Sequence, residues 1–324
     1  MGNKNEVQKT LQEISKFFKI KCSSNINNFI DCHIERNKNT IMLSQHDLIK
    51  QILENFKQDL KQTKLFNTPA PTNSKIAQID DEKTILDNIQ QTKYRSGVGS
   101  LLYLLKHSRP DIANQVRELS KVMDKPNLIH YKALLRVINY INKTKHYKLI
   151  LQPNITTMYT LKGYCDSDYA GDPNTRRSVS GYIIYLNKCP IIWKSKMQKS
   201  VTLSSTEAEY IALSEITSDI MFVSQVLIFL NAQATYPIKV YVDNIGAIYI
   251  SKNAGSSNQT KHIDTRYHFV REYIENGSVK VIYIRSDKNK ADPFTKNLKS
   301  ASFKKHFDPM FIGSKNSKSG RLLK

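Results

Sequence analysis

The stretch Gly163-Tyr164-Cys165-Asp166-Ser167-Asp168 places an acidic residue directly after a short apolar strand, which the pattern predicts over 159–164. The sequence that follows predicts further strands and helices. The strands are expected at 180–186, 190–194, 237–242 and 279–284, and the helices at 206–230, 245–252, 262–275 and just after Asp292. This order mixes hairpins with crossovers, so it predicts an α/β fold with a mixed sheet flanked by helices.

Three more carboxylates lie at comparable boundaries. Glu209 falls in the first turns of the long helix, Asp243 ends the 237–242 strand, and Asp292 begins the last helix. Such positions can converge at one edge of a sheet. Converging carboxylates repel one another unless a cation joins them, and Mg²⁺ prefers oxygen ligands. Each acid taken alone is better explained as a helix cap or a turn residue.

The first half has a different, mostly helical pattern. Helices are predicted at 5–20, 45–56, 94–106, 110–123 and 129–143, and a two-stranded hairpin over 29–43. Residues 61–92 are polar and contain prolines, as is typical of a linker. We therefore divide the chain into segments 1–60, 61–92, 93–150 and 155–300, followed by a basic, flexible tail over 301–324.

Charge is the first clue to a partner. The 324 residues carry a formal net charge of +21, spread over both halves. Folded chains this basic commonly bind nucleic acid, although lysine enrichment from an AT-rich coding sequence would look the same.

Four cysteines without C-x-x-C spacing argue against a zinc site or a disulfide scaffold. We expect no membrane partner, because no stretch approaches about 20 apolar residues.

A series of ordered motifs resembles the copia-type retrotransposon Pol polyproteins, namely the end of the reverse transcriptase, the connection and the ribonuclease H domain. The motifs of the second half are Gly163 to Tyr182, Trp193 to Gln198, Leu203 to Tyr210, Tyr241 to Asn244, Lys261 to Arg271 and Ala291 to Lys296. In the first half, Phe29 to Gln45 resembles the end of the polymerase palm, and Tyr94 to Tyr103 and Arg109 to Ile112 resemble the connection. The resemblance runs from about Glu6 to Phe307.

The resemblance implies a ribonuclease H-like fold with a five-stranded mixed sheet. It also implies that the enzyme cleaves the RNA strand of an RNA–DNA hybrid with two Mg²⁺ ions, or Mn²⁺. Asp166 would bridge both ions, Asp292 would complete the site of the ion that holds the attacking water, and Glu209 and Asp243 would hold the other ion. Expected substrate contacts are Ser205 and Thr206 to 2′-hydroxyls, Asn244 to sugar or phosphate, and the basic residues Arg176, Arg177, Lys194, Lys196 and Lys199 to the backbone.

The sequence departs from the relatives in two ways. Cellular ribonucleases H often carry a histidine in the loop before the last aspartate, and the loop 285–291 has none. His262 or His268 could assist instead, although a structural role is the simpler interpretation. The polymerase's Tyr/Phe-x-Asp-Asp turn is also absent, so we expect a C-terminal part of a polyprotein, or a decayed copy, without polymerase activity of its own.

Two alternatives stay open beside an active ribonuclease H. One is a catalytically inactive remnant that only binds nucleic acid. The other is a subunit that needs the missing polymerase portion to cover the apolar face of residues 29–56. Trp193 could stack on a hybrid, although core packing is the simpler expectation. From the family alone we expect an intracellular location, in the cytoplasm, the nucleus or both.

Overall fold

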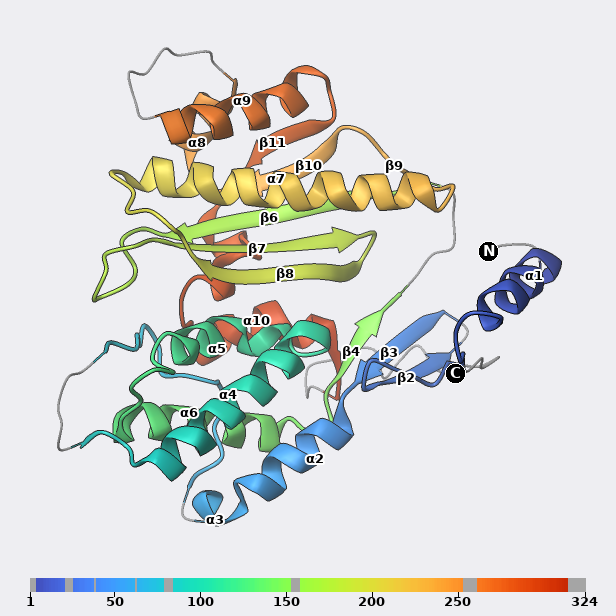
Figure 1. Ribbon diagram of the computed structural model, residues 1–324. Coiled ribbons are helices and arrows are strands. Elements are labelled where there is room, and N and C mark those ends of the chain that lie inside the picture. The colour runs from blue at the N-terminus through green and yellow to red at the C-terminus, as the bar shows by residue number, and fades with distance from the viewer. Residues whose placement is uncertain are drawn as a thin grey trace.

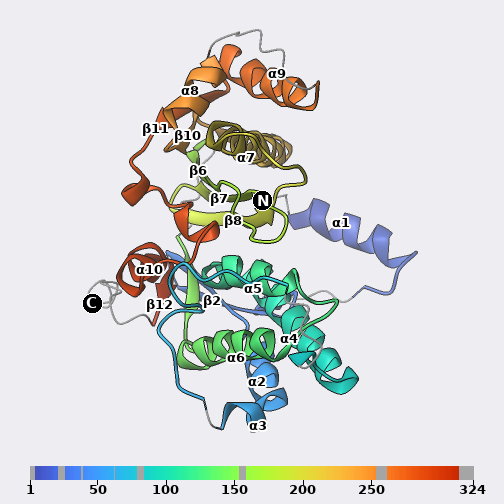
Figure 2. The same ribbon diagram turned by 90° about the vertical axis from the view of Figure 1, so that its left-hand side faces the viewer.

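The computed structural model describes residues 4–20, 26–37, 39–61, 63–78, 84–152, 158–252 and 261–313. Two five-stranded sheets and two groups of helices make up most of this part of the chain (Figure 1). Both views place the C-terminal sheet above the helices of the first half (Figure 2).

The C-terminal sheet has the order β11-β10-β6-β7-β8. An antiparallel meander runs from the central strand β6 (Leu161–Asp168) through β7 (Val179–Leu186) to the edge strand β8 (Cys189–Met197). Strands β10 (Ile238–Val242) and β11 (Val279–Tyr283) extend the sheet in parallel with β6. Short strands β5 (Met158–Tyr159) and β9 (Gln233–Ala234) pair beside it. This is the expected ribonuclease H-like, mixed five-stranded sheet.

One long helix covers a face of this sheet. In α7 (Ser205–Phe229), Leu213, Ile216 and Ile220 are fully buried, and they share a core with apolar residues of the sheet. By length and composition α7 could cross a membrane, which we did not expect from the sequence, but 56% of its apolar window is buried inside the protein. Helices α8 (Ile245–Lys252) and α9 (Lys261–Glu275) pack beside it (Figure 1).

The first half forms a second body. Strands β1 (Asn28–Phe29), β2 (Cys32–Asn37) and β3 (Thr40–Ser44) precede α2 (His46–Asn55) and α3 (Lys57–Leu60). Three helices follow, α4 (Asn88–His107), α5 (Ala113–Ser120) and α6 (Leu128–Lys143), and then β4 (Lys148–Leu151). Helix α1 (Lys4–Ser15) stands at the N-terminal end (Figure 1). The predicted linker is shorter than expected, because α4 begins at Asn88.

The apolar face of residues 29–56 is largely covered by the chain itself. Ile49, Ile52 and Phe56 are buried in the core shared by α2, α4 and α6. A Cβ atom at Gly97 of α4 would lie 2.7 Å from the Phe56 ring, so only glycine allows this approach. The expectation that this face is exposed is therefore wrong for Ile49, Ile52 and Phe56, whereas Phe29 and Ile30 are exposed.

The predicted flexible tail is wrong for residues 301–313. Helix α10 (Ser300–Phe307) and strand β12 (Phe311–Ile312) are formed there, and β12 pairs with β4 to complete the order β1-β2-β3-β4-β12. Phe307 and Phe311 are buried in the core of the first half. The sequence suggested a flexible tail because lysines dominate it, although Phe307 and Phe311 are core residues. Residues 314–324 lie outside the described part of the chain.

The two bodies share one core. Tyr164, Ile183 and Phe294, on the sheet face opposite α7, belong to the same buried cluster as α4, α5 and α6. Trp193 packs against this cluster, and its indole N–H donates to the Leu105 carbonyl at 2.9 Å. Core packing of Trp193 is thus confirmed.

One testable prediction concerns the buried ion pair between Arg109 and Asp111. The Arg109 guanidinium donates to both oxygens of Asp111, at 2.9 and 2.7 Å, and both side chains are nearly inaccessible. Because Asp111→Ala leaves a buried charge unpaired, we expect a loss of about 3–5 kcal/mol in the free energy of unfolding, measured by urea denaturation.

Asp287→Ala is the matched control, since Arg285 and Asp287 have the same Arg-x-Asp spacing in an exposed pair. Its expected effect is within about 0.5 kcal/mol. Equal losses in the two variants would show that burial does not set the strength of the Arg109 pair.

Candidate functional site

Strand register brings two of the predicted acids to the same level. Tyr164 of β6 pairs with Tyr241 of the parallel strand β10. Asp166 and Asp243 each lie two residues further along, at the carboxyl ends of neighbouring strands. Asp166 is almost completely buried, whereas Asp243 is half-buried.

Helix α7 supplies the third acid. Ser204 caps its N-terminus by accepting the Glu207 N–H at 3.1 Å, which fixes where the helix begins. One turn on, Oε1 of Glu209 accepts from the backbone N–H and the hydroxyl of Ser167, both at 2.9 Å. Oxygens of Asp166, Glu209 and Asp243 all lie within 4.8 Å of one another.

The fourth acid lies beside this group. Gly181 is opposite Asp166 in the sheet, and a Cβ there would lie 2.6 Å from the Thr295 methyl carbon. Glycine thus lets the 3₁₀ turn η4 (Asp292–Phe294) rest on the strand, where the Thr295 hydroxyl donates to Asp166. Asp292 itself forms an ion pair with Lys296 at 2.6 Å. The structure therefore groups three of the four acids and places Asp292 at their edge.

Burial and mutual repulsion make two of the carboxylates hard to ionise. Burial raises the pKa of Asp166 to about 7, with Asp243 and Asp292 adding to the rise and the Thr295 hydrogen bond and Lys296 opposing it. Burial, followed by the charges of Asp166 and Asp243, raises the pKa of Glu209 well above its usual value.

The arrangement fits a divalent cation. Oε2 of Glu209 is buried and has no hydrogen-bond partner among the described residues. An unsatisfied carboxylate oxygen is costly to bury, and a metal ion would satisfy it. The donors are all carboxylate oxygens, which suits Mg²⁺ or Mn²⁺ better than softer metals.

Asn289 is a site residue that sequence reasoning missed. It is fully buried in the loop 285–291, and its amide donates to the Cys165 carbonyl at 2.8 Å. It also accepts the Ala291 N–H at 3.1 Å, which holds the loop just before Asp292. The only sequence signal that could have indicated Asn289 was its position in the loop where cellular ribonucleases H often carry a histidine. An asparagine in a polar loop is otherwise indistinguishable from a surface residue.

The predicted substrate contacts on α7 and α8 lie at the same end of the sheet as the carboxylates. Ser205 is exposed in the first turn of α7, and Thr206 is half-buried beside Gly246. Oδ1 of Asn244 accepts the Ala247 N–H at 2.9 Å and so caps α8. This capping bond occupies the carbonyl side of Asn244, and no hydrogen bond within the described part of the chain takes up its amide N–H groups.

The basic candidates divide into two groups. Arg176 and Arg177 are exposed in the loop between β6 and β7, and Lys199 is exposed after β8. Lys194 pairs with Asp219 at 2.8 Å and Lys196 with Glu215 at 2.9 Å, so these two lie over the α7 face. The structure does not bring Lys194 and Lys196 to the carboxylates.

Of the two candidate histidines, His268 is the one whose side chain the structure describes. His268 is exposed on α9, and no contact among the described residues joins it to the acids. The side chain of His262 lies outside the described residues.

Comparison with known proteins follows from this geometry. No protein-family model matches the chain. The Retrovirus-related Pol polyprotein from transposon RE1 of Arabidopsis thaliana is 33% identical over 294 residues, which are 91% of this chain and 19% of that polyprotein. The Pol polyprotein from transposon TNT 1-94 of Nicotiana tabacum is 34% identical over 298 residues, 91% of this chain and 22% of its own length.

Among solved structures, LC11-RNase H1, isolated from compost by a metagenomic approach, aligns with 17% identity and a TM-score of 0.33, covering 42% of this chain and 91% of its own. The chain spans about a fifth of the length of the two polyproteins. Since a third of its residues are shared with them over nine-tenths of its length, the chain belongs to the copia-type, retrovirus-related Pol polyproteins.

Proposed function

We propose that this chain is a metal-dependent ribonuclease H, which hydrolyses the RNA strand of an RNA–DNA hybrid. The observation that carries the proposal is the group of three buried or half-buried carboxylates with an unsatisfied Glu209 oxygen. It lies at the carboxyl edge of a ribonuclease H-like sheet in a chain of a retrotransposon Pol family.

Asp166, Glu209 and Asp243 would hold the cations. Bound Mg²⁺ would make a water more acidic and stabilise the leaving oxygen of the phosphodiester. Ser167 and Thr295 orient the Glu209 and Asp166 carboxylates through hydrogen bonds. Asp292 pairs with Lys296 through Oδ1, so that lysine would compete with a cation for this one oxygen of Asp292.

The substrate side of the proposal rests on the first turn of α7. The hydroxyls of Ser205 and Thr206 stand one turn before Glu209, where they could reach 2′-hydroxyls across a minor groove. The exposed Arg176 and Arg177 would contact the backbone of the same duplex. A hybrid is thus the substrate that these groups suit best.

The first prediction removes one ligand without burying a new group. Asp243 is half-buried, so Asp243→Asn should fold normally and melt within a few degrees of the parent. Loss of a metal ligand should lower Mg²⁺-dependent cleavage of a labelled RNA–DNA hybrid by at least about 10²-fold.

Asp124→Asn, which changes an exposed aspartate in the loop after α5, is the control and should cleave like the parent. Cleavage by Asp243→Asn at the parent's rate would refute the site. If the parent binds the hybrid with Mg²⁺ present but never cuts it, the chain is instead a binding remnant.

The second prediction follows from the raised pKa values. In chelator, the free energy of unfolding should fall as pH rises from about 4 through 7, because Asp166 and Glu209 hold protons in the folded state that the unfolded chain has already lost. Melting curves at pH 6 and pH 8 measure this fall.

Added Mg²⁺ should raise the melting temperature more at pH 8 than at pH 6, because the ligands must be ionised to bind it. Glu209→Gln should flatten the pH dependence seen in chelator. A Mg²⁺ response of equal size at both pH values, unchanged in Glu209→Gln, would place metal binding elsewhere.

A further inference from the structure

A pocket of about 470 Å³ lies in the first half of the chain, between helix α6 and the segment 63–76 that runs along it. Two contacts tie this part of the chain to α6. The Lys143 ammonium donates to the Asn67 side chain at 2.8 Å, and the His130 ring bonds to the Ala77 carbonyl at 2.9 Å. None of the four candidate acids lines the pocket, and its volume suits a small molecule.

The charged side chains that line this pocket are all positive. They are Lys64, Lys75, Lys132 and Arg136, and no aspartate or glutamate of the described residues lines it. Lys75 is neutralised by Asp168, at 2.7 Å. Lys64, Lys132 and Arg136 take part in no ion pair within the described part of the chain, so the pocket has an excess of positive charge.

Arg136 is the charge that most lacks a partner. Its Nε–H is buried and has no hydrogen-bond partner among the described residues, and its Nη2 donates to the Thr68 hydroxyl over a long 3.4 Å. The guanidinium carbon lies 4.1 Å from the centre of the Phe66 ring, which holds the group at the pocket wall. Burial lowers the pKa of Arg136, so the charge is kept there at a cost that a bound anion would offset.

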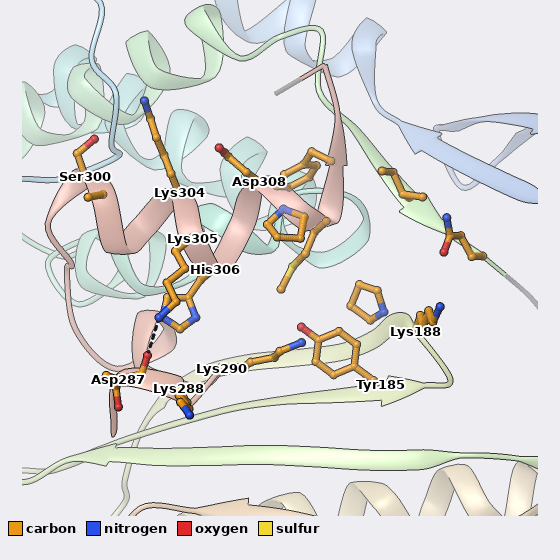
Figure 3. A pocket seen from close by; sticks show the side chains of 17 residues that line it. Tyr185, Lys188, Asp287, Lys288, Lys290, Ser300, Lys304, Lys305, His306 and Asp308 are labelled. Atoms are coloured by element: carbon orange, nitrogen blue, oxygen red, sulfur yellow. Dashed lines mark hydrogen bonds between the residues drawn. The ribbon is translucent and has the colours of Figure 1, made fainter. Parts of the chain in front are cut away.

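The remaining wall offers apolar surface that a ligand can reach. Ile129 is 57% exposed, and Ile76 and Ala133 are half-buried. The larger cavity between α10 and the turn that joins β7 to β8 differs in this respect, because its Tyr185 ring is buried with Lys290 over its face (Figure 3). That cavity offers a ligand mainly its lysines, whereas the pocket beside α6 offers both a charge and an accessible apolar wall.

We infer that this pocket binds a small organic carboxylate with an apolar body. Its carboxylate would pair with Arg136, whose planar N–H donors match two oxygens, and its carbon skeleton would rest on Ile129, Ile76 and Ala133. An inorganic anion would use only the charge, and a neutral apolar compound would leave the charge unpaired. The site goes beyond the proposed nuclease activity, because it requires no metal, no nucleic acid and none of the four acids.

The test is isothermal titration calorimetry of the full chain with 2-naphthoate in metal-free buffer, so that the carboxylate group of the other site contributes nothing. The parent should bind one molecule. Arg136→Met keeps an unbranched apolar side chain against Phe66 and removes the buried N–H without a partner, so its melting temperature should not fall. It should bind 2-naphthoate at least about 10-fold more weakly, because the charge-assisted hydrogen bonds are lost.

Arg36→Met is the matched control, since it makes the same change in net charge at an exposed arginine of β2 that does not line the pocket. It should bind like the parent. Equal weakening in the two variants, unchanged affinity in Arg136→Met, or failure of the parent to bind at millimolar 2-naphthoate would overturn the assignment. So would neutral 2-naphthamide binding as tightly as 2-naphthoate, or acetate displacing 2-naphthoate at equal concentration, because the charge or the apolar wall would then contribute nothing.

Discussion

The carboxylate group of Asp166, Glu209 and Asp243 is the constraint on which the rest of the site depends. Like charges brought within 4.8 Å at a buried sheet edge oppose folding unless something neutralises them. The surrounding chain supplies only partial relief, from the Ser167 and Thr295 hydrogen bonds and the charge of Lys296. The raised pKa values of Asp166 and Glu209 reflect the cost of burial and repulsion that remains, and a bound cation is the simplest way to remove this cost.

The site also depends on the first half of the chain. Lys121 of the first half bonds to Asp172 in the loop between β6 and β7, at 2.7 Å. Asn297, just after η4, donates to the Ser74 carbonyl and accepts from Asn114, at 2.7 and 3.0 Å. These buried contacts fix both loops that flank the carboxylates, so the helical body acts as a support for the site.

Sequence reasoning located most of the C-terminal fold and missed elements that only long-range contacts create. The alternation of apolar and polar residues in β6, β7 and β10 and the apolar stripe of α7 are local signals. They predicted these elements and therefore the position of the acids at the ends of the elements. Strands β4 and β12 are short and pair across some 160 residues, for example Leu149 with Phe311, so no local pattern indicates them. Asn289 was missed because its role is set by one carbonyl of a distant strand.

The most direct test of the central claim is to locate the metal. Crystals of the chain grown with Mn²⁺ would show bound ions by their anomalous scattering. The account predicts one or two peaks in contact with carboxylate oxygens of Asp166, Glu209 and Asp243, including the Glu209 oxygen that now has no partner. Clear density for these side chains with no peak between them, at millimolar Mn²⁺ and pH 8, would contradict it.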